Sequence, residues 1–354
     1  MIGRTAFVVA LWTAVSPGVQ PVSARPVTSV APRIEQVRIA SDPGVVLAGE
    51  LQLPPADTQR PPVVLLLGGG GPSPHGIYPL LEKRLLARGI ATLSFDKRGI
   101  GKSTGTFVDA MDVAQRDAGA VLAYLRSRQD VIDPARIAVL GVSQGGVIGP
   151  ALAVDGPPIA AVVTMSAPAG ERGVLFLDEM REKLATSGMQ GDAIPPILDA
   201  TRRYLGGLTT AAPPESIAAD RIAVGEAFMA AGWSREQADG AVRTLGDPAT
   251  SSLYTVAAGD VLARVKAPVL AVFAADDTVV SSRLAMPAAQ VALRGNADAT
   301  IVQMPGVEHA YKPLVTTAAG KREYQGWPIS DPATIDLIDR WLTPRLSPGK
   351  TPRQ

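Results

Sequence analysis

Residues 140–146 read LGVSQGG, and this short stretch constrains the fold more than any other part of the chain. An apolar run precedes it, and an apolar segment of helical length, residues 147–154, follows it. Ser143 therefore lies at a predicted strand-to-helix corner, where Gly141 and Gly145 leave room that a Cβ would fill. This layout is typical of a nucleophile elbow, which exposes the serine hydroxyl at the N-terminus of a helix. Glycine and serine are common residues, so the motif needs support from the rest of the chain.

The composition is that of a globular protein, with 46% hydrophobic residues, 19% charged residues and a net charge of +1 over 354 residues. It excludes a disordered chain and provides no basic surplus for nucleic acid. The length suits one large α/β domain with an insertion, or two domains. The absence of cysteine excludes disulfides, a thiol nucleophile and a thiolate metal site. Any histidine-dependent mechanism must use one of two residues, His75 or His309.

The N-terminus has the pattern of a secretory signal peptide. Arg4 supplies a positive charge, residues 6–15 form a short apolar stretch, and the small residues before position 25 fit cleavage after Ala24. We therefore expect residues 1–24 to be removed and the mature protein to be periplasmic or secreted. A retained membrane anchor is the alternative for the same stretch, and no other segment has the pattern of a membrane span.

Strand-like and helix-like segments alternate along most of the remaining chain. Two β-like runs joined by the turn signal Asp42-Pro43-Gly44 predict an antiparallel hairpin at a sheet edge. Apolar runs predict buried strands at residues 62–67, 90–95, 136–140, 159–165, 268–273 and 300–304, and helical spacing predicts helices at 78–88, 113–126, 147–154, 283–293 and 335–342. This alternation predicts an α/β fold with a mostly parallel sheet covered by helices on both faces.

The alternation stops between residues 169 and 262, a segment rich in Ala, Leu and Met with no strand-like run. Its periodicity predicts helices at residues 174–185, 194–205, 217–231 and 235–245. We interpret residues 169–262 as a helical cap, or lid, inserted into an α/β core formed by residues 25–168 and 263–354.

Two stretches that resemble nucleotide-binding motifs do not satisfy them. Gly101-Lys102-Ser103 matches the end of a phosphate loop, but Asp96 stands where that loop requires glycine. A dinucleotide fingerprint that begins at Gly99 would have Thr104 in place of its last glycine. No organic cofactor and no metal is predicted, and the expected partner is a small-molecule substrate.

Ser143, Asp277 and His309 each follow a predicted strand, in that order along the chain. Sites in open parallel sheets form beyond the carboxyl ends of the strands, and adjacent strands lie about 5 Å apart, so distant residues can converge there. A serine hydroxyl needs a base to take its proton, and a carboxylate can fix the tautomer of that histidine. The three residues therefore predict nucleophilic catalysis by a Ser-His-Asp triad.

Five sequence blocks resemble the α/β-hydrolase superfamily, and most closely its esterase and serine-aminopeptidase-like branch with a helical cap. The blocks are GGGGP at 68–72, FDKRGIGKS at 95–103, GVSQGG at 141–146, APVLAVFAADDTVV at 267–280 and PGVEHAY at 305–311. The resemblance implies an α/β-hydrolase sheet, with Ser143 as nucleophile and His309 as base. It also implies Asp277 as the acid, since one residue and then two apolar residues follow it, and Asp276 is the alternative.

The same resemblance implies two backbone donors for the oxyanion. One is the N–H of Gln144, directly after the nucleophile, and the other comes from the glycine loop. Family loops place the second donor at Gly70, with Gly69 as the alternative.

Four polar residues near these blocks have less specific expectations. His75 is expected to pack in its loop or to contact the edge of the substrate. Asp96 and Arg98 are expected to form an ion pair or a hydrogen-bond network that braces the loop beside the elbow. Glu308 is expected to face solvent or to orient the loop that carries His309.

The resemblance implies a serine hydrolase that cleaves a carboxylic ester through an acyl-enzyme. An aminopeptidase or amidase is the alternative, and it would need a cap carboxylate to hold a free α-amino group. Asp178, Glu179 and Glu182 are the candidates for that role, although a solvated helix face also explains them. A non-catalytic binding protein of the same fold is the third interpretation.

Overall fold

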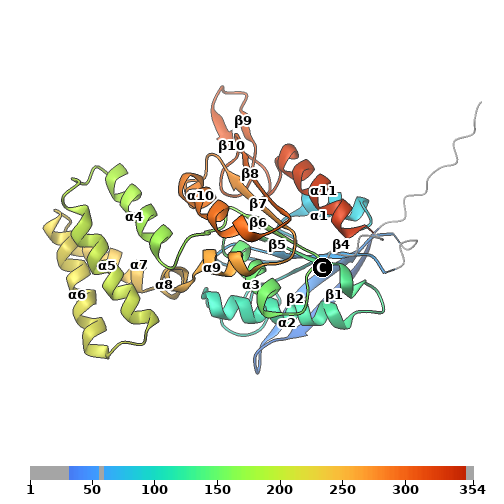
Figure 1. Cartoon of the computed structure of the whole chain (residues 1–354), viewed down its shortest axis with the longest axis horizontal. Coiled ribbons are helices and arrows are strands. Elements are labelled where there is room, and N and C mark those ends of the chain that lie inside the picture. The colour runs from blue at the N-terminus through green and yellow to red at the C-terminus, as the bar shows by residue number, and fades with distance from the viewer. Residues whose placement is uncertain (1–31, 56–59, 348–354) are drawn as a thin grey trace, which may run out of the picture. The chain divides into compact units, whose positions relative to one another are not determined.

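This computed structural model describes residues 32–55 and 60–347. Their central feature is an eight-stranded sheet (Figure 1). The strands lie in the order β1-β2-β4-β3-β5-β6-β7-β8. β1 (Arg33–Ala40) pairs antiparallel with β2 (Val46–Leu53), β2 pairs antiparallel with β4, and the other neighbours are parallel. The remaining strands are β3 (Val63–Leu67), β4 (Ala91–Phe95), β5 (Ile137–Val142), β6 (Ala161–Met165), β7 (Val269–Ala274) and β8 (Ala299–Met304).

The predicted α/β fold, with its mostly parallel sheet and its N-terminal antiparallel hairpin, is thereby confirmed. The predicted signal peptide, residues 1–24, lies outside the described residues. None of the described helices is long and apolar enough to cross a membrane.

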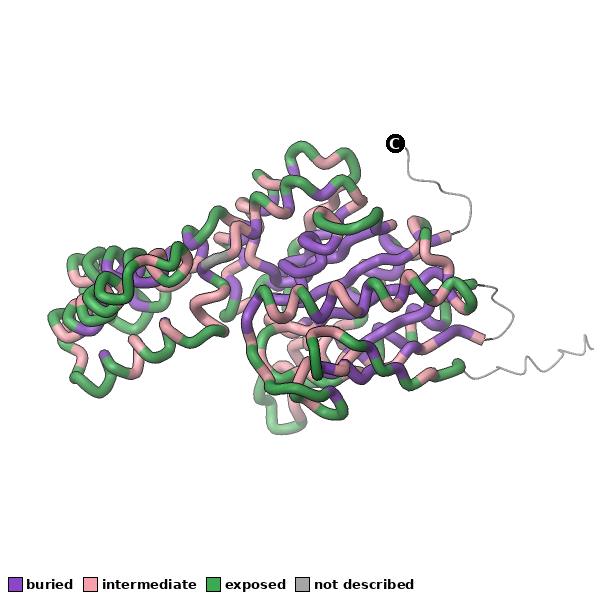
Figure 2. The backbone as a smooth tube through the Cα atoms, turned by 90° about the horizontal axis from the view of Figure 1, so that it is seen from below, coloured by how far each residue is buried: buried purple, intermediate pink, exposed green. Residues whose placement is uncertain are grey.

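Alternate residues of each central strand enter different hydrophobic cores, one on each face of the sheet. In β3, Val63, Leu65 and Leu67 join one core, whereas Val64 and Leu66 join the other. Successive side chains of a strand point to opposite faces, so a strand buried on both faces must be apolar throughout. Figure 2 shows the central strands buried along their length, which explains the unbroken apolar runs of the sequence.

Helices cover both faces of the sheet. The first core is completed by α2 (Met111–Ser127), α3 (Gln144–Asp155), α9 (Ala258–Arg264) and α10 (Ser282–Ala292), and the second by α1 (Pro79–Ala87) and α11 (Pro332–Leu346). The turns η1 (Pro134–Arg136) and η2 (Leu293–Gly295) are short 3-10 helices. Because the helices cover the two faces of the sheet, the loops that follow the parallel strands lie at the carboxyl edge of the sheet.

The chain between β6 and β7 consists of helices and connecting loops. We call α4 (Val174–Thr186), α5 (Ile194–Thr209), α6 (Pro214–Ala230), α7 (Arg235–Gly246) and α8 (Pro248–Thr255) the helical segment. The four helices predicted here are present, and α8 is additional. The segment has a third hydrophobic core of its own, in which Ile197, Leu205 and Phe228 are fully or almost fully buried. The predicted cap reached residue 262, but α9 packs into the first core of the sheet.

A two-stranded ribbon, β9 (Leu314–Thr316) and β10 (Arg322–Tyr324), follows β8 and was not predicted (Figure 1). Three-residue strands are too short to show a period in the sequence. The ribbon matters to the site because Tyr324 contacts the loop after β7.

A buried carboxylate joins α1 to α11. Asp339 of α11, with a side chain 3% exposed, accepts hydrogen bonds from Arg88 Nη2 at 2.7 Å and from Arg84 Nη1 at 3.1 Å. Burial opposes ionisation of Asp339, but the hydrogen bonds from Arg88, Thr343 and Arg84 outweigh it and lower the pKa of that carboxyl below its ordinary value. The charged form of Asp339 therefore stabilises the folded chain.

We expect Asp339→Asn to lower the free energy of unfolding at pH 7 by about 1–3 kcal/mol, the usual worth of hydrogen bonds to a charged group. Because the folded pKa is depressed, the advantage of the wild type is present above the ordinary aspartate pKa and is lost as the pH falls through the folded pKa. Urea unfolding at pH 7 and pH 3 measures both values. The control is Asp336→Asn, which removes a half-exposed partner of Arg84. An equal Asp339→Asn penalty at the two pH values would contradict this account.

Candidate active site

Ser143 occupies the corner between β5 and α3 in a conformation that L-residues rarely adopt, with φ 53° and ψ −115°. Its N–H donates to the carbonyl of Met165 on β6 at 2.8 Å, which ties the corner to the sheet. A Cβ on Gly141 would collide with the Gly145 carbonyl, and a Cβ on Gly145 would lie 2.6 Å from the Leu67 carbonyl oxygen. Both glycines are therefore required for the close approach of strand, loop and helix.

Asp277 and His309 are joined by a hydrogen bond at the carboxyl ends of β7 and β8. His309 Nδ1 lies 2.8 Å from Asp277 Oδ2, and the side chain of Asp277 is 1% exposed. The N–H groups of Val279 and Val280 donate to the other carboxylate oxygen, each at 2.8 Å. Burial opposes ionisation of Asp277, but its contacts with His309 outweigh that cost and hold the pKa of the carboxyl below its ordinary value. An ionised carboxylate thus orients the imidazole.

The neighbouring Asp276 has a different environment. It is exposed, and its Oδ2 accepts a hydrogen bond from Tyr324 Oη of β10 at 2.7 Å. Of the two adjacent aspartates, Asp277 is the one that contacts His309. The structure brings this pair together, but no hydrogen bond joins His309 to Ser143 within the described residues. Catalytic hydrogen bonds are often long in free enzymes and shorten when substrate binds.

The glycine loop after β3 lies against the elbow. A Cβ on Gly69 would be 3.4 Å from the Cβ of Ser143, whereas a Cβ on Gly70 would face Asp109 Oδ2. The Gly69 carbonyl accepts a hydrogen bond from Lys97 Nζ, and the Gly71 N–H donates to Asp109 Oδ2, each at 2.5 Å. Two charged side chains therefore hold this loop.

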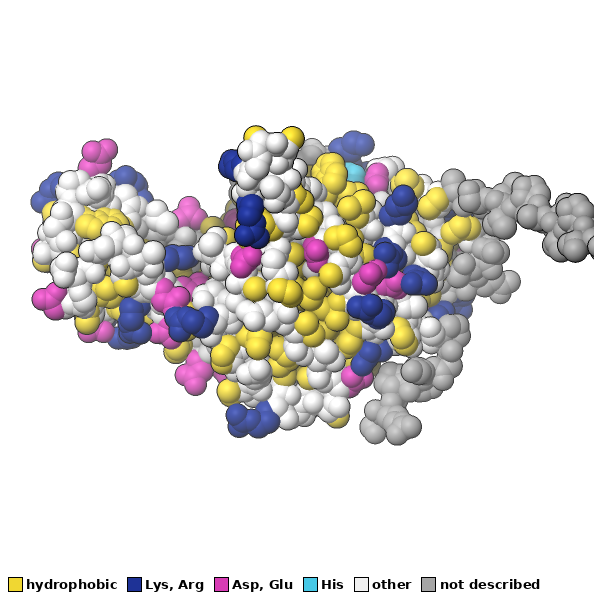
Figure 3. Space-filling view, turned by 90° about the horizontal axis from the view of Figure 1, so that it is seen from above, with side chains coloured by type: hydrophobic (Ala, Val, Ile, Leu, Met, Phe, Trp, Pro, Cys, Tyr) yellow, Lys and Arg dark blue, Asp and Glu magenta, His cyan; other side chains and the backbone are white. Residues whose placement is uncertain are grey.

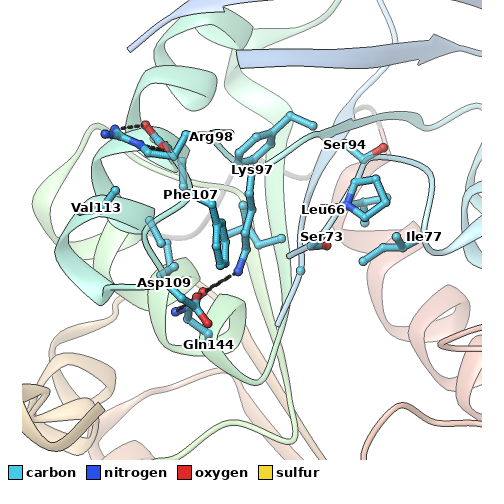
Figure 4. A pocket seen from close by; sticks show the side chains of 18 of the residues that line it. Leu66, Ser73, Ile77, Ser94, Lys97, Arg98, Phe107, Asp109, Val113 and Gln144 are labelled. Carbon is cyan, nitrogen blue, oxygen red and sulfur yellow. Dashed lines mark hydrogen bonds and ion pairs between the residues drawn. The ribbon is translucent and has the colours of Figure 1, made fainter. Parts of the chain in front are cut away.

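The same two side chains hold Gln144, the first residue of α3. Gln144 Oε1 accepts from Lys97 Nζ at 2.8 Å, and Gln144 Nε2 donates to Asp109 Oδ1 at 3.0 Å. Lys97 Nζ and Asp109 Oδ1 are 3.5 Å apart. Figure 4 shows Lys97 and Asp109 reaching toward Gln144 beside Phe107. These four residues line a cavity of about 30 Å³. Burial lowers the pKa of the Lys97 ammonium, and the charge of Asp109 opposes this effect.

Sequence reasoning missed Lys97 and Asp109. Lys97 lies inside the FDKRGIGKS block, between Asp96 and Arg98, and its position in that block is the one sequence signal that could have identified it. Asp109 belongs to none of the five blocks, and no local pattern marks it.

Asp96 and Arg98 do not pair with each other, and each takes part in a hydrogen-bond network, which is one of the two arrangements predicted for them. Arg98 Nη2 instead binds Asp117 at 2.6 Å and Asp42 at 2.7 Å, which ties the loop after β4 to α2 and to the β1–β2 turn. Asp96 is almost fully buried and accepts the N–H groups of His75 and Lys102. The predicted network thus exists, but its partners come from other elements.

His75 lies between two carboxylates. Its Nδ1 is 2.7 Å from Asp96 Oδ1, and its Nε2 is 3.4 Å from Glu50 Oε1. Both ring nitrogens are thereby engaged, which agrees with packing of His75 in its loop. Glu308 orients the loop that carries His309, because it accepts the N–H groups of Ala310 and Lys312.

The three acidic candidates of the helical segment all have partners. Asp178 pairs with Arg181 at 2.8 Å, and Glu182 pairs with Arg283 of α10. Glu179 Oε1 accepts the N–H of Ser281 at 3.0 Å, so α4 contacts the loop that carries Asp277. Burial raises the pKa of Glu179, and the hydrogen bond from Ser281 opposes that shift. An open groove of about 510 Å³ lies here, between α4 and that loop.

The sequence profile described as the alpha/beta hydrolase family matches residues 63–318. This chain belongs to that family. The match spans β3 through β9 and so includes the elbow, the Asp277–His309 pair and the helical segment. Among the described residues, no group of three or more His, Cys, Asp or Glu side chains is placed to hold a metal ion.

Curated relatives include a candidate non-heme bromoperoxidase, BpoC of Mycobacterium tuberculosis, which is 28% identical over 253 residues, or 70% of this chain and 86% of the relative. The quorum-quenching protein AidA of Acinetobacter baumannii is 34% identical over 116 residues, or 32% of this chain and 38% of the relative.

Solved structures share the fold at low sequence identity. The α/β-hydrolase GrgF from Penicillium has a TM-score of 0.54 and 16% identity, with 88% of this chain and 98% of GrgF covered. A thermophilic esterase from Thermogutta terrifontis has a TM-score of 0.51 and 18% identity, with 88% of this chain and 100% of the esterase covered. These identities establish the fold alone.

We expect the elbow conformation to reduce stability in a way that glycine relieves. Ser143→Gly should have a free energy of unfolding about 1 kcal/mol higher than Ser143→Ala, because glycine adopts positive φ without a steric penalty. Both variants lack the hydroxyl, so the difference between them does not depend on the nucleophile. Urea unfolding of the two variants measures the difference, and an alanine variant at least as stable as the glycine variant would exclude strain at this corner.

Proposed function

We propose that this chain is a serine hydrolase that cleaves carboxylic esters, with Ser143 as nucleophile, His309 as general base and Asp277 as the acid. The observation that carries the proposal is the hydrogen bond between His309 and Asp277, beyond the same sheet edge that carries the Ser143 corner. Family membership supports hydrolysis as the class of reaction. The likeness to a solved esterase supports an ester as the substrate.

In this mechanism Ser143 Oγ attacks the ester carbonyl while His309 Nε2 takes the hydroxyl proton. Asp277 accepts the Nδ1–H hydrogen bond and stabilises the imidazolium that forms. The N–H groups of Gln144 and Gly70 donate to the oxyanion of the tetrahedral intermediate. When the intermediate collapses, the C–O bond breaks and the alcohol leaves with the proton from His309. Water then repeats the sequence on the acyl-enzyme and releases the acid.

The partners of the acidic candidates favour an ester over a peptide with a free α-amino group. An aminopeptidase would use an available carboxylate to bind the ammonium, but Asp178 and Glu182 are paired with arginines. Glu179 binds a backbone N–H, and burial favours its neutral form. The aminopeptidase or amidase remains the second candidate, since its triad chemistry would be the same. The helical segment is proposed as the cap that selects the acyl group.

The charge distribution supports a small uncharged or weakly charged substrate. On the face shown in Figure 3, acidic and basic side chains are interspersed among apolar ones, and neither sign gathers into a patch. This agrees with the net charge of +1. A polyanion such as nucleic acid would require a concentrated basic surface.

We expect Ser143→Ala to reduce kcat/KM on p-nitrophenyl esters by at least about a thousandfold, because loss of the nucleophile removes the acyl-enzyme route. Wild-type protein should react with a fluorophosphonate probe, and Ser143→Ala should not. Equal labelling of the two proteins would contradict the assignment. Faster turnover of aminoacyl-p-nitroanilides than of esters would instead establish the peptidase.

The adjacent aspartates supply the matched control for this experiment. Asp277→Asn should lose activity severely, because the amide no longer fixes the imidazole tautomer. Asp276→Asn removes a charge that faces Tyr324 rather than His309, and it should stay within a few-fold of the wild type. Similar losses in the two variants would contradict the choice of Asp277.

We also propose that the protein is exported after removal of residues 1–24. The mature protein, isolated from an export-competent bacterial host, should begin at Arg25 when sequenced from its N-terminus. An intact Met1 on protein recovered with membranes would favour the retained anchor instead.

A further inference from the structure

The peptide bond between Gly69 and Gly70 is oriented by a bound carbonyl. Lys97 Nζ donates to the Gly69 oxygen at 2.5 Å. The described chain has no cis peptide bond, and in a trans peptide the C=O and the next N–H point to opposite sides. The Gly70 N–H therefore points away from Lys97. Gly69 itself lies against Ser143, since a Cβ built on Gly69 would be 3.4 Å from the Cβ of Ser143.

The conformation of the glycine loop depends on contacts with residues outside it. Residues 68–71 are all glycine, so they contribute no side chain to packing and have the largest conformational freedom of any residue type. A carbonyl and an N–H of this loop are bound from outside, by Lys97 and Asp109. Loss of either contact would free a peptide of the loop to rotate.

The same network holds the residue after the nucleophile. Lys97 and Asp109 both bind the Gln144 side chain, at 2.8 Å and 3.0 Å. The two donors assigned to the oxyanion, Gly70 N–H and Gln144 N–H, thus come from segments fastened to one ion pair. A purely structural link between these segments would not need charged groups.

Placing these charges here is costly. The side chains of Lys97 and Asp109 are 15% and 14% exposed, and an ammonium removed from water loses hydration free energy that only close pairing restores. A charged donor nevertheless has an advantage at this point, because it binds a carbonyl more strongly than a neutral donor does.

We propose that Lys97, fixed by Asp109 and Gln144, is a positioning residue for the oxyanion hole: it holds the Gly69 carbonyl so that the Gly70 N–H faces the substrate oxyanion. Lys97 does not touch the substrate in this account, and it acts through the Gly69–Gly70 peptide. The inference rests on the proposed function, because it concerns the oxyanion of the same acyl-transfer reaction.

The test is Lys97→Met, which keeps the length of the side chain and removes the charged donor. We expect kcat on p-nitrophenyl esters to fall about 10- to 100-fold, less than the full loss of an oxyanion donor, with KM changed less than threefold. Lys102→Met, at an exposed lysine of the same loop, is the matched control and should retain kcat. A Lys97→Met variant with wild-type kcat would overturn the proposal.

Thionoesters separate positioning of the oxyanion hole from general damage. Sulfur is a weak hydrogen-bond acceptor, so a thionoester gains little from the oxyanion donors. The ratio of kcat for the oxygen ester to kcat for its thionoester should therefore fall in Lys97→Met and stay unchanged in Lys102→Met. A loss of kcat with an unchanged ratio would also overturn the proposal, since Lys97 would then act elsewhere.

A second variant tests whether Lys97 and Asp109 act together. Asp109→Asn should lower kcat, and adding it to Lys97→Met should cost little more, because the two residues act as one unit. Full additivity would count against a shared role.

A crystal structure of Lys97→Met separates this inference from the proposed function. If wild-type protein and Ser143→Ala turn over esters equally, the proposed function fails. The inference is then still decided by the Gly69–Gly70 peptide, which should be rotated or disordered in Lys97→Met. A peptide with unchanged orientation would overturn the positioning role.

Discussion

The parallel pairing of β7 with β8 is the interaction on which the site depends most directly. Val269 to Ala274 run in register with Ala299 to Met304, so the two strands end side by side. Asp277 and His309 follow these ends within a few residues, and their hydrogen bond closes the distance that remains. A shift of one residue in this register would turn every β8 side chain to the opposite face and displace the loop that carries the histidine.

The other half of the site combines features that are locally unfavourable. Ser143 has positive φ, the adjacent loop is a run of glycines, and Lys97 is a largely buried cation. Each feature disfavours the folded state, and a neighbouring contact offsets each cost. β6 binds the Ser143 N–H, Lys97 binds the loop, and Asp109 pairs with Lys97. Strain and buried charge collected at one place are characteristic of sites built for chemistry rather than for stability.

The sequence predicted the parallel sheet well because its strands are buried on both faces, which requires the unbroken apolar runs seen in β3, β5 and β7. Topology also predicted that the aspartates after β7 lie close to His309, because adjacent strand ends converge, and the family resemblance favoured Asp277 over Asp276. The sequence was insufficient wherever partners come from unrelated elements. Arg98 reaches Asp42 and Asp117, and Lys97 reaches Asp109, and no local period or motif encodes these choices. The strands β9 and β10 could not be predicted because three residues are too few to show a period.

The helical segment has a hydrophobic core separate from the two cores of the sheet. The segment buries most of its apolar side chains in its own core, although Leu175 of α4 packs in the first core of the sheet. The two parts meet where Glu179 of α4 binds the Ser281 N–H, four residues after Asp277, and where Glu182 of α4 pairs with Arg283 of α10. A change in the position of α4 would therefore act on the loop that holds the acid as well as on the space above it. In the proposed function, selection of the substrate by the segment and orientation of the acid would therefore be coupled through α4.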